Sequence, residues 1–137
     1  MLYRILTLVV FTFLANSALA DSVESSPMAA AKPELKTVLK SQLERVDETE
    51  VVLSHVKIPP NSSLPKHWHP GEEFAYILKG QLTVWMKDQG KTVMNEGDAA
   101  KVPLKAIHSA GTGDEGATLL VFRVHEKGQP ERVLVTE

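Results

Sequence analysis

The sequence predicts an all-β domain, built as a sandwich or a closed antiparallel barrel. Short runs rich in β-branched and aromatic residues follow one another closely from residue 35 onward. Turn residues, several of them glycine, separate these runs, as they do in sandwiches and barrels. No long stretch has the apolar spacing of an amphipathic helix. A chain of 137 residues is about the length of one such domain.

The N-terminal region has the pattern of a secretory signal peptide. Residues 1–20 combine a basic start, an apolar block at 5–14 and small residues at 18–20, so we expect cleavage before Asp21. An uncleaved membrane anchor is the alternative, but the apolar block is only about half of the roughly 20 residues that span a bilayer. We therefore expect an exported protein, periplasmic or secreted, without a stable membrane anchor. Residues 21–34, rich in Ser, Ala and Pro, predict a flexible lead-in.

Residues 35–137 form the predicted barrel domain. The predicted strands are the β-rich runs at residues 36–39, 50–58, 73–78, 81–86, 91–94, 99–102, 117–124 and 132–135. The segments Asp88-Gln89-Gly90 and Asn95-Glu96-Gly97 each place a glycine where a hairpin loop needs a positive φ. Both segments are therefore predicted hairpin turns.

Alternation within the strands predicts which side chains share a face, because residues two apart point the same way. In residues 81–86, Leu82, Val84 and Met86 fall on one side; in residues 117–124, Leu119, Val121 and Arg123 do. The opposite sides of these strands are also largely apolar. One side would line the barrel and the other would be covered by a second layer or a second subunit. We expect a homodimer on this basis.

Composition excludes several classes of function and ligand. The formal net charge is −2, with no basic segment that would bind nucleic acid. The chain has no cysteine, so neither disulfides nor thiolate ligands are available. Any metal must be held by nitrogen or oxygen atoms.

The segment around residues 67–73 carries the main chemical signal. His67 and His69 are two apart on an extended stretch, so both imidazoles face the same side. Pro70 and Gly71 turn the chain, and we expect the acidic residues that follow to begin a strand running back beside the first. Imidazoles and a carboxylate suit one divalent transition metal, Fe, Mn, Ni, Cu or Zn. Two surface histidines in a loop are the alternative explanation of the pair.

The wider pattern resembles the cupin superfamily. The motif G-x5-H-x-H-x3,4-E-x6-G is matched by His67, His69, Glu73 and Gly80, and the motif G-x5-P-x-G-x2-H-x3-N by Gly97, Pro103 and His108. Three positions depart from the motifs: Asn61 and Lys105 replace glycines, and Thr112 replaces the closing asparagine.

The resemblance implies a jelly-roll β-barrel, the double-stranded β-helix. It also implies one divalent metal held by His67, His69, Glu73 and His108, with the remaining coordination positions open as in a catalytic site. Glu72 is the rival for the carboxylate role. If Glu72 were the ligand, Phe74 and Tyr76 would line the pocket in place of Ala75 and Ile77.

Other polar residues are weaker candidates. His55 and Tyr76 are candidate catalytic residues, His55 as an acid or base and Tyr76 as a hydrogen-bond donor to substrate, although packing roles would explain both. His125, beside Glu126 and Lys127, is expected to be solvated. Arg123 could anchor an anionic substrate, but a surface or salt-bridging role is the stronger expectation.

Fold alone does not determine function, and the resemblance implies a range of reactions. The leading hypothesis is a metal-dependent oxidoreductase, similar to small dioxygenase-like cupins, that acts on a small organic molecule able to chelate the ion. A non-enzymatic periplasmic protein that binds a small molecule or metal chelate is one alternative. A metal-dependent decarboxylase or isomerase is another, and it requires a dedicated proton donor.

Overall fold

The computed structural model describes residues 31–136. The predicted signal peptide and most of the predicted lead-in lie outside the described residues. Within 31–136 the chain forms strands joined by turns and loops, which confirms the all-β prediction. No helix in that part of the chain is long and apolar enough to cross a membrane. The strands are β1 (Glu34–Gln42), β2 (Thr49–Ile58), β3 (His67–Trp68), β4 (Gly71–Met86), β5 (Gly90–Asn95), β6 (Ala99–Val102), β7 (His108–Gly111), β8 (Ala117–Glu126) and β9 (Val133–Leu134).

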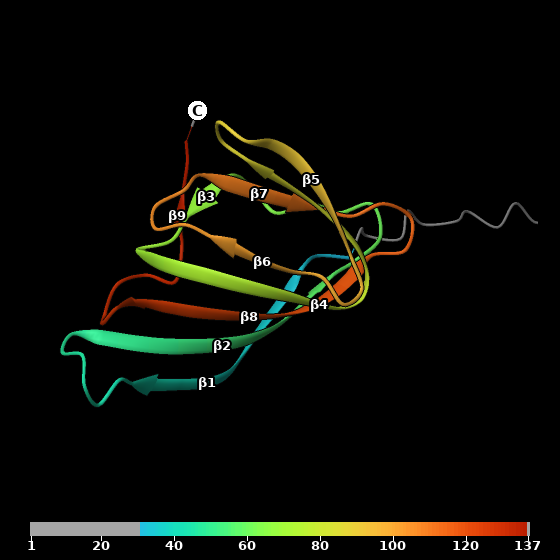
Figure 1. Cartoon of the computed structure of the whole chain (residues 1–137). Coiled ribbons are helices and arrows are strands. Elements are labelled where there is room, and N and C mark those ends of the chain that lie inside the picture. Colours follow the sequence, from blue (N-terminus) through green and yellow to red (C-terminus); the bar gives the residue numbers. More distant parts are fainter. Residues whose placement is uncertain (1–30, 137) are drawn as a thin grey trace, which may run out of the picture.

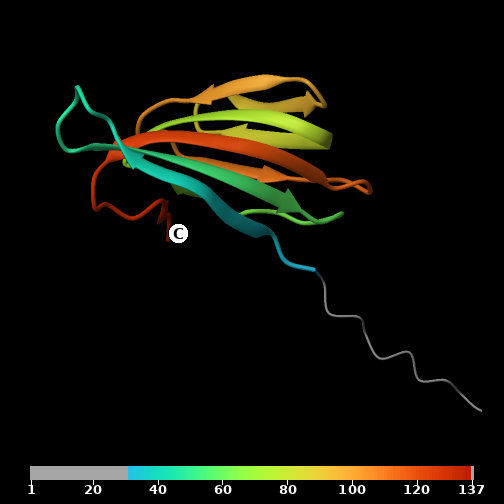
Figure 2. The same ribbon diagram turned by 90° about the horizontal axis from the view of Figure 1, so that it is seen from below.

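The strands form two layers that share β4 (Figures 1 and 2). β1, β2, β8, the first half of β4 and β6 make one layer, in which β8 lies between β2 and β4. The second half of β4 pairs with β5 and β7, and β3 and β9 continue that layer beyond β7. Every pairing is antiparallel. The curled arrangement confirms the predicted jelly-roll barrel.

One long strand joins the two layers. The sequence predicts separate strands at 73–78 and 81–86, but both belong to β4, which runs unbroken for 16 residues. The strand changes layer at an irregularity between Ile77 and Lys79, next to Gly80. Gly80 has φ of 79°, and a Cβ atom there would lie 2.2 Å from the Gly116 carbonyl oxygen. Only glycine fits this corner, which lets one strand serve both layers.

The two predicted hairpin turns have different outcomes. Asp88 and Gly90 both have positive φ, and their turn joins β4 to β5 in a hairpin, as predicted. Gly97 also has positive φ, at 89°. Its turn does not form a hairpin, because β5 and β6 pair with different halves of β4 and not with each other. The turn carries the chain from one layer to the other.

The hydrophobic core occupies one part of the space between the layers. Val56, Ile77, Leu82, Leu119 and Val121 are all buried there, and each fully buried aliphatic side chain contributes about 1.5–3 kcal/mol. The predicted alternation is confirmed, because the intervening side chains of these strands point outward. Most of the buried polar residues lie outside this core, and they include the three histidines of the cupin-like motifs.

Candidate metal centre

Strand register brings the predicted ligands together. His67 on β3 is the direct cross-strand partner of His108 on β7, and Glu73 on β4 is the partner of Arg123 on β8. β7 lies between β3 and β4, so the expectation that β4 runs back beside β3 is wrong. The intervening strand comes from about 40 residues further along the chain, and it supplies the third imidazole.

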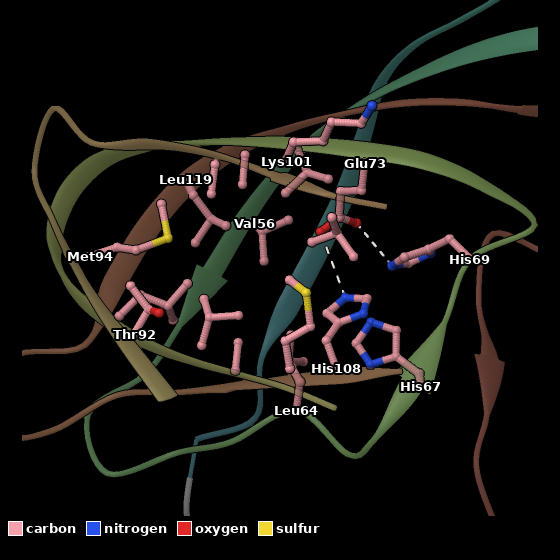
Figure 3. A pocket seen from close by; sticks show the side chains of 18 of the residues that line it. Val56, Leu64, His67, His69, Glu73, Thr92, Met94, Lys101, His108 and Leu119 are labelled. Carbon is pink, nitrogen blue, oxygen red and sulfur yellow. Dashed lines mark ion pairs between the residues drawn. The ribbon is translucent and has the colours of Figure 1, made fainter. Parts of the chain in front are cut away.

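The three imidazoles form a compact, buried cluster. His67, His69 and His108 each offer a ring nitrogen, and these atoms lie within 4.8 Å of one another. The ring centroids are 4.3 to 5.1 Å apart, and each residue is at most 4% exposed. Figure 3 shows the three rings and the Glu73 carboxylate pointing toward one another at one end of a cavity. This is the number and type of ligands that a mononuclear metal site uses.

Main-chain carbonyl groups fix the tautomer of each ring. Nδ1 of His67 lies 2.8 Å from the Pro65 carbonyl oxygen, Nδ1 of His108 lies 2.9 Å from that of Ala106, and Nδ1 of His69 bonds to that of Glu131. A carbonyl oxygen only accepts, so each Nδ1 must carry the proton and each neutral Nε2 keeps its lone pair. Nε2 of His69 and of His108 are buried without a hydrogen-bond partner. The donor set therefore fits a divalent metal ion.

Glu73 completes the cluster but is shared with a cation. Its Oε2 lies 2.9 Å from Nε2 of His69 and 3.2 Å from Nε of Arg123, and its Oε1 lies 3.9 Å from Nε2 of His108. Nε2 of His69 and Oε2 of Glu73 are close enough for an ion pair but do not have the geometry of a hydrogen bond. This arrangement is consistent with two ligand atoms that face the same metal position. Glu72 instead points outward and pairs with Lys101. Glu73 is thus the carboxylate that faces the histidines.

Burial favours the neutral form of His67 and of His108. It lowers the pKa of His67 to about 4, and the nearby His108 and His69 rings act in the same direction. The pKa of His108 is also lowered, mainly by burial. For Glu73, burial favours the neutral acid, but the neighbouring Arg123 cation acts in the opposite direction, and the pKa of the carboxyl group is lowered. Neutral rings and an ionised carboxylate are the protonation states that coordinate metals.

The three departures from the motif pattern have local explanations. Asn61 and Lys105, which stand in place of glycines, adopt positive φ of 50° and 57°. Asn tolerates this region, whereas Lys105 costs roughly 1–2 kcal/mol, and its main-chain N–H donates to the His69 carbonyl oxygen. Thr112 Oγ1 donates to the Pro59 carbonyl oxygen and accepts from the Ser62 N–H. The hydroxyl of Thr112 therefore fixes the loop before the motif histidines.

A cavity of about 460 Å³ opens beside the histidines. This volume is in the range of small-molecule sites. Away from the metal ligands, its wall is mainly apolar and includes Val56, Leu64, Leu82, Met94 and Leu119 (Figure 3). The cavity thus has one end able to coordinate and one end that favours an apolar group.

The two predicted catalytic residues lie elsewhere. On β2 the inward side chains are Val52, Ser54 and Val56, so His55 faces outward and does not line the cavity. Tyr76 is 47% exposed on the outer face of β4. The structure brings neither side chain to the histidine cluster, because both have the outward parity of their strands.

Two expectations about β8 are corrected. His125, expected to be solvated, is 3% exposed because it continues the inward row of Val121 and Arg123. Arg123 is not on the surface; it is 2% exposed and forms the expected salt bridges, to Glu73 and to Glu131. Sequence reasoning missed Glu131 altogether. Its contact with His69 uses the main-chain carbonyl, which leaves no signal in residue type.

Comparison with known proteins gives relatives of varied function. Over 72 residues the chain is 29% identical to an uncharacterized protein of Methanocaldococcus jannaschii, covering 53% of this chain and 60% of that one. The crystal structure of an RmlC-like cupin family protein from the same organism has a TM-score of 0.59 at 20% identity, covering 72% of this chain and 86% of that one.

Two other solved structures match this chain at 26% identity. The DMSP lyase DddQ from Ruegeria pomeroyi has 26% identity and a TM-score of 0.57, and the match covers 62% of this chain but only 43% of the lyase. The polyketide cyclase RemF from Streptomyces resistomycificus has 26% identity and a TM-score of 0.54, covering 66% of this chain and 75% of the cyclase. This chain thus spans less than two thirds of the lyase and of the curated relative.

The family is given by a domain match. Residues 54–123, about half of the chain, match the cupin domain, and this segment contains all four predicted ligands and the cross-strand pair of Glu73 and Arg123. The matched segment, the double-layered β fold and the histidine cluster agree, and the chain belongs to the cupin family.

Proposed function

We propose that this chain is a metal-dependent cupin enzyme whose substrate is a small organic molecule with an oxygen-containing head and an apolar body. The observation that carries the proposal is the set of three imidazoles whose Nδ1 atoms are held by carbonyl groups at one end of a largely apolar cavity. His67, His69 and His108 would hold the ion, with Glu73 as the fourth ligand. Fe, Mn, Ni, Cu and Zn all suit this donor set.

When bound, a divalent transition metal at this centre would orient and polarise an oxygen-bearing substrate as a Lewis acid. The residues of the chain prepare the site for that role. Arg123 holds the Glu73 carboxylate in its ionised form, and the carbonyl groups keep the imidazoles aimed at one point. The apolar wall at Val56, Leu82 and Leu119 excludes water and binds the body of the substrate.

Among cupin reactions, we favour an oxygen-dependent oxidation of dioxygenase type. Decarboxylation and isomerisation need a group that delivers a proton to the substrate. Glu73, the carboxylate nearest to the histidines, is paired with Arg123 and ionised, so it is poorly suited to donate a proton. An oxidation places no such demand on the chain.

An oxygen-independent lyase or cyclase is the second candidate. It is favoured by the two solved structures with 26% identity, which are described as a DMSP lyase and a polyketide cyclase. A third possibility is a protein that binds a small chelator without turnover. An oxidoreductase would need oxygen for turnover, a lyase or cyclase would turn over substrate without oxygen, and a binding protein would bind its ligand without turnover.

The test is turnover by protein loaded separately with Fe, Mn, Ni, Cu and Zn, against a panel of diketones, catechols, flavonols and oxalate. Oxygen uptake with product formation by one loaded form supports the oxidoreductase. Product formation that persists under anaerobic conditions supports the lyase or cyclase, and saturable binding without product supports the binding protein. The His108→Ala protein treated with the same metals is the control, and equal activity in that variant would refute a role for this centre.

Export and homodimerisation stay predictions. Surface apolar residues on the outer face of the first layer support self-association, because Leu53, Phe74, Tyr76, Leu120 and Phe122 line a shallow apolar depression there. Such a face on an exported protein would be covered by a second copy of the chain.

A further inference from the structure

The segment after β8 closes one end of the barrel beside the metal centre. This C-terminal strap, residues 127–135, leaves β8 and passes to the other layer, where β9 pairs with β3 (Figure 1). At its start the Lys127 N–H donates to the Glu48 carbonyl oxygen, and at its end the Val135 N–H donates to that of Lys66. The strap is therefore attached to both layers, and its residues Glu131 and Arg132 line the cavity.

Glu131 is the residue of the strap that contacts the centre most directly. Its main-chain carbonyl accepts the hydrogen bond from Nδ1 of His69. Its Oε2 lies 2.7 Å from Nη1 of Arg123, and its Oε1 accepts from Oγ1 of Thr37 at 3.4 Å. Arg123 in turn places Nε 3.2 Å from the Glu73 carboxylate. One residue thus reaches two of the predicted ligands, His69 through its backbone and Glu73 through Arg123.

The charges along this path explain why a glutamate stands at 131. Arg123 is 2% exposed, so its cation must be compensated inside the barrel. Glu73 supplies one negative charge at an ion-pair distance from Nε, and Glu131 supplies a second, which accepts a hydrogen bond from Nη1. The hydrogen bond to Glu131 restrains the guanidinium group, and this restrains the ion pair that its Nε makes with Glu73.

We propose that Glu131 is a positioning residue of the metal centre. Its carboxylate anchors the strap to Arg123 and Thr37, and this anchor keeps its carbonyl on His69 and keeps Arg123 on Glu73. The proposal rests on the proposed metal centre and concerns the affinity for the ion, not the reaction. Groups that hold metal ligands in place typically change metal affinity by about 10–100-fold when they are removed.

The experiment compares three variants in the full chain. Glu131→Ala removes the anchor, Glu131→Gln keeps an acceptor oxygen for Arg123 without the charge, and Glu126→Ala is the matched control. Glu126 is an exposed glutamate near the same strap, and its carboxylate bonds only to Gln129 among the described hydrogen bonds. Zn²⁺ affinity is measured by calorimetric titration, and the visible spectrum of the Co²⁺-loaded protein reports the coordination geometry.

We expect Glu131→Ala to weaken Zn²⁺ binding about 10-fold or more and to change the Co²⁺ spectrum. Glu131→Gln should lie between Glu131→Ala and wild type, and Glu126→Ala should match wild type. The thermal midpoint of each metal-free variant is measured as well, and the titrations are made well below the lowest midpoint, because Glu131→Ala removes one of the two carboxylates that the buried Arg123 contacts. Glu131→Gln provides the same test if the alanine variant does not fold.

Two results would overturn the role of Glu131. The first is Zn²⁺ affinity within about twofold of wild type together with an unchanged Co²⁺ spectrum. The second is an equal loss of affinity in Glu126→Ala, which would indicate a general effect on the strap. If the wild-type protein itself binds neither Zn²⁺ nor Co²⁺, the metal centre is refuted first, and this result is distinct from both.

Discussion

Two clusters of buried polar side chains lie on the inner side of this barrel; one contains three histidines, and the other contains His125 beside Glu50. In one, each of His67, His69 and His108 donates Nδ1–H to a main-chain carbonyl, so each Nε2 is directed at a common point. In the other, neither ring nitrogen of His125 has a hydrogen-bond partner. Its Nε2 lies 3.4 Å from Glu50 Oε1, and that same oxygen lies 2.8 Å from Nζ of Lys40.

The difference indicates that burial alone does not identify a candidate metal ligand. His125 is 3% exposed, as deeply buried as the motif histidines. Its carboxylate neighbour Glu50 is already compensated by Lys40, whose ammonium group lies close enough to lower the pKa of the Glu50 carboxyl group despite burial. A lysine at that distance also repels a cation. The main-chain carbonyls and the third imidazole distinguish the metal centre from this second cluster.

The largest expected effect is loss of the metal. His67→Ala or His108→Ala removes one of three converging imidazoles, and we expect bound metal to fall from about one ion per chain to near zero. His125→Ala should retain wild-type metal content, because the Lys40 and Glu50 pair does not need it. Elemental analysis of dialysed proteins measures all three. Equal metal content in the three variants would erase the distinction between the clusters.

The next largest effect is the loss of stability in acid of protein stripped of metal; burial lowers the pKa of His67 and also that of His125, so both clusters act in the same direction. The pKa of His67 is about 4 in the folded chain against 6.5 when unfolded, so the unfolded chain binds the proton first as the pH falls. The stability that this neutral ring provides is present above pH 6.5 and is lost between about 6.5 and 4, by on the order of 3 kcal/mol. Urea unfolding with a chelator, followed across this pH range, measures the loss. A His67→Gln variant with the same pH dependence as wild type would contradict it.

The sequence predicted the parts of this site that follow from local spacing. His67 and His69 share a face because they are two apart, and Leu119, Val121 and Arg123 share one for the same reason. Extending the same alternation by one step would have placed His125 inside. The charged neighbours Glu126 and Lys127 suggested solvent instead, but Glu126 has the outward parity of β8 and Lys127 follows the end of the strand.

Non-local contacts were beyond the reach of the sequence pattern. β7 enters between β3 and β4 from distant residues, so no local spacing indicates that His67 and His108 are partners. The positive φ of Lys105 could not be predicted from the sequence either, because lysine rarely adopts this backbone conformation. Glu131 contacts His69 through its backbone, and any residue type has a carbonyl group.

The smallest effect concerns the two adjacent carboxylates of β4. Glu73→Gln removes the charge that faces the histidines and Arg123, but three imidazoles remain, so we expect about a tenfold loss of Zn²⁺ affinity, or about 1.4 kcal/mol. Glu72→Gln makes the same chemical change one residue away, on the outward side, where its partner is the exposed Lys101. It should leave the affinity unchanged, because exposed ion pairs contribute little. Calorimetric titration of both variants with Zn²⁺ measures the two affinities. A larger loss in Glu72→Gln than in Glu73→Gln would mean that the outward carboxylate serves the metal, and that the direction of β4 side chains does not select the ligand.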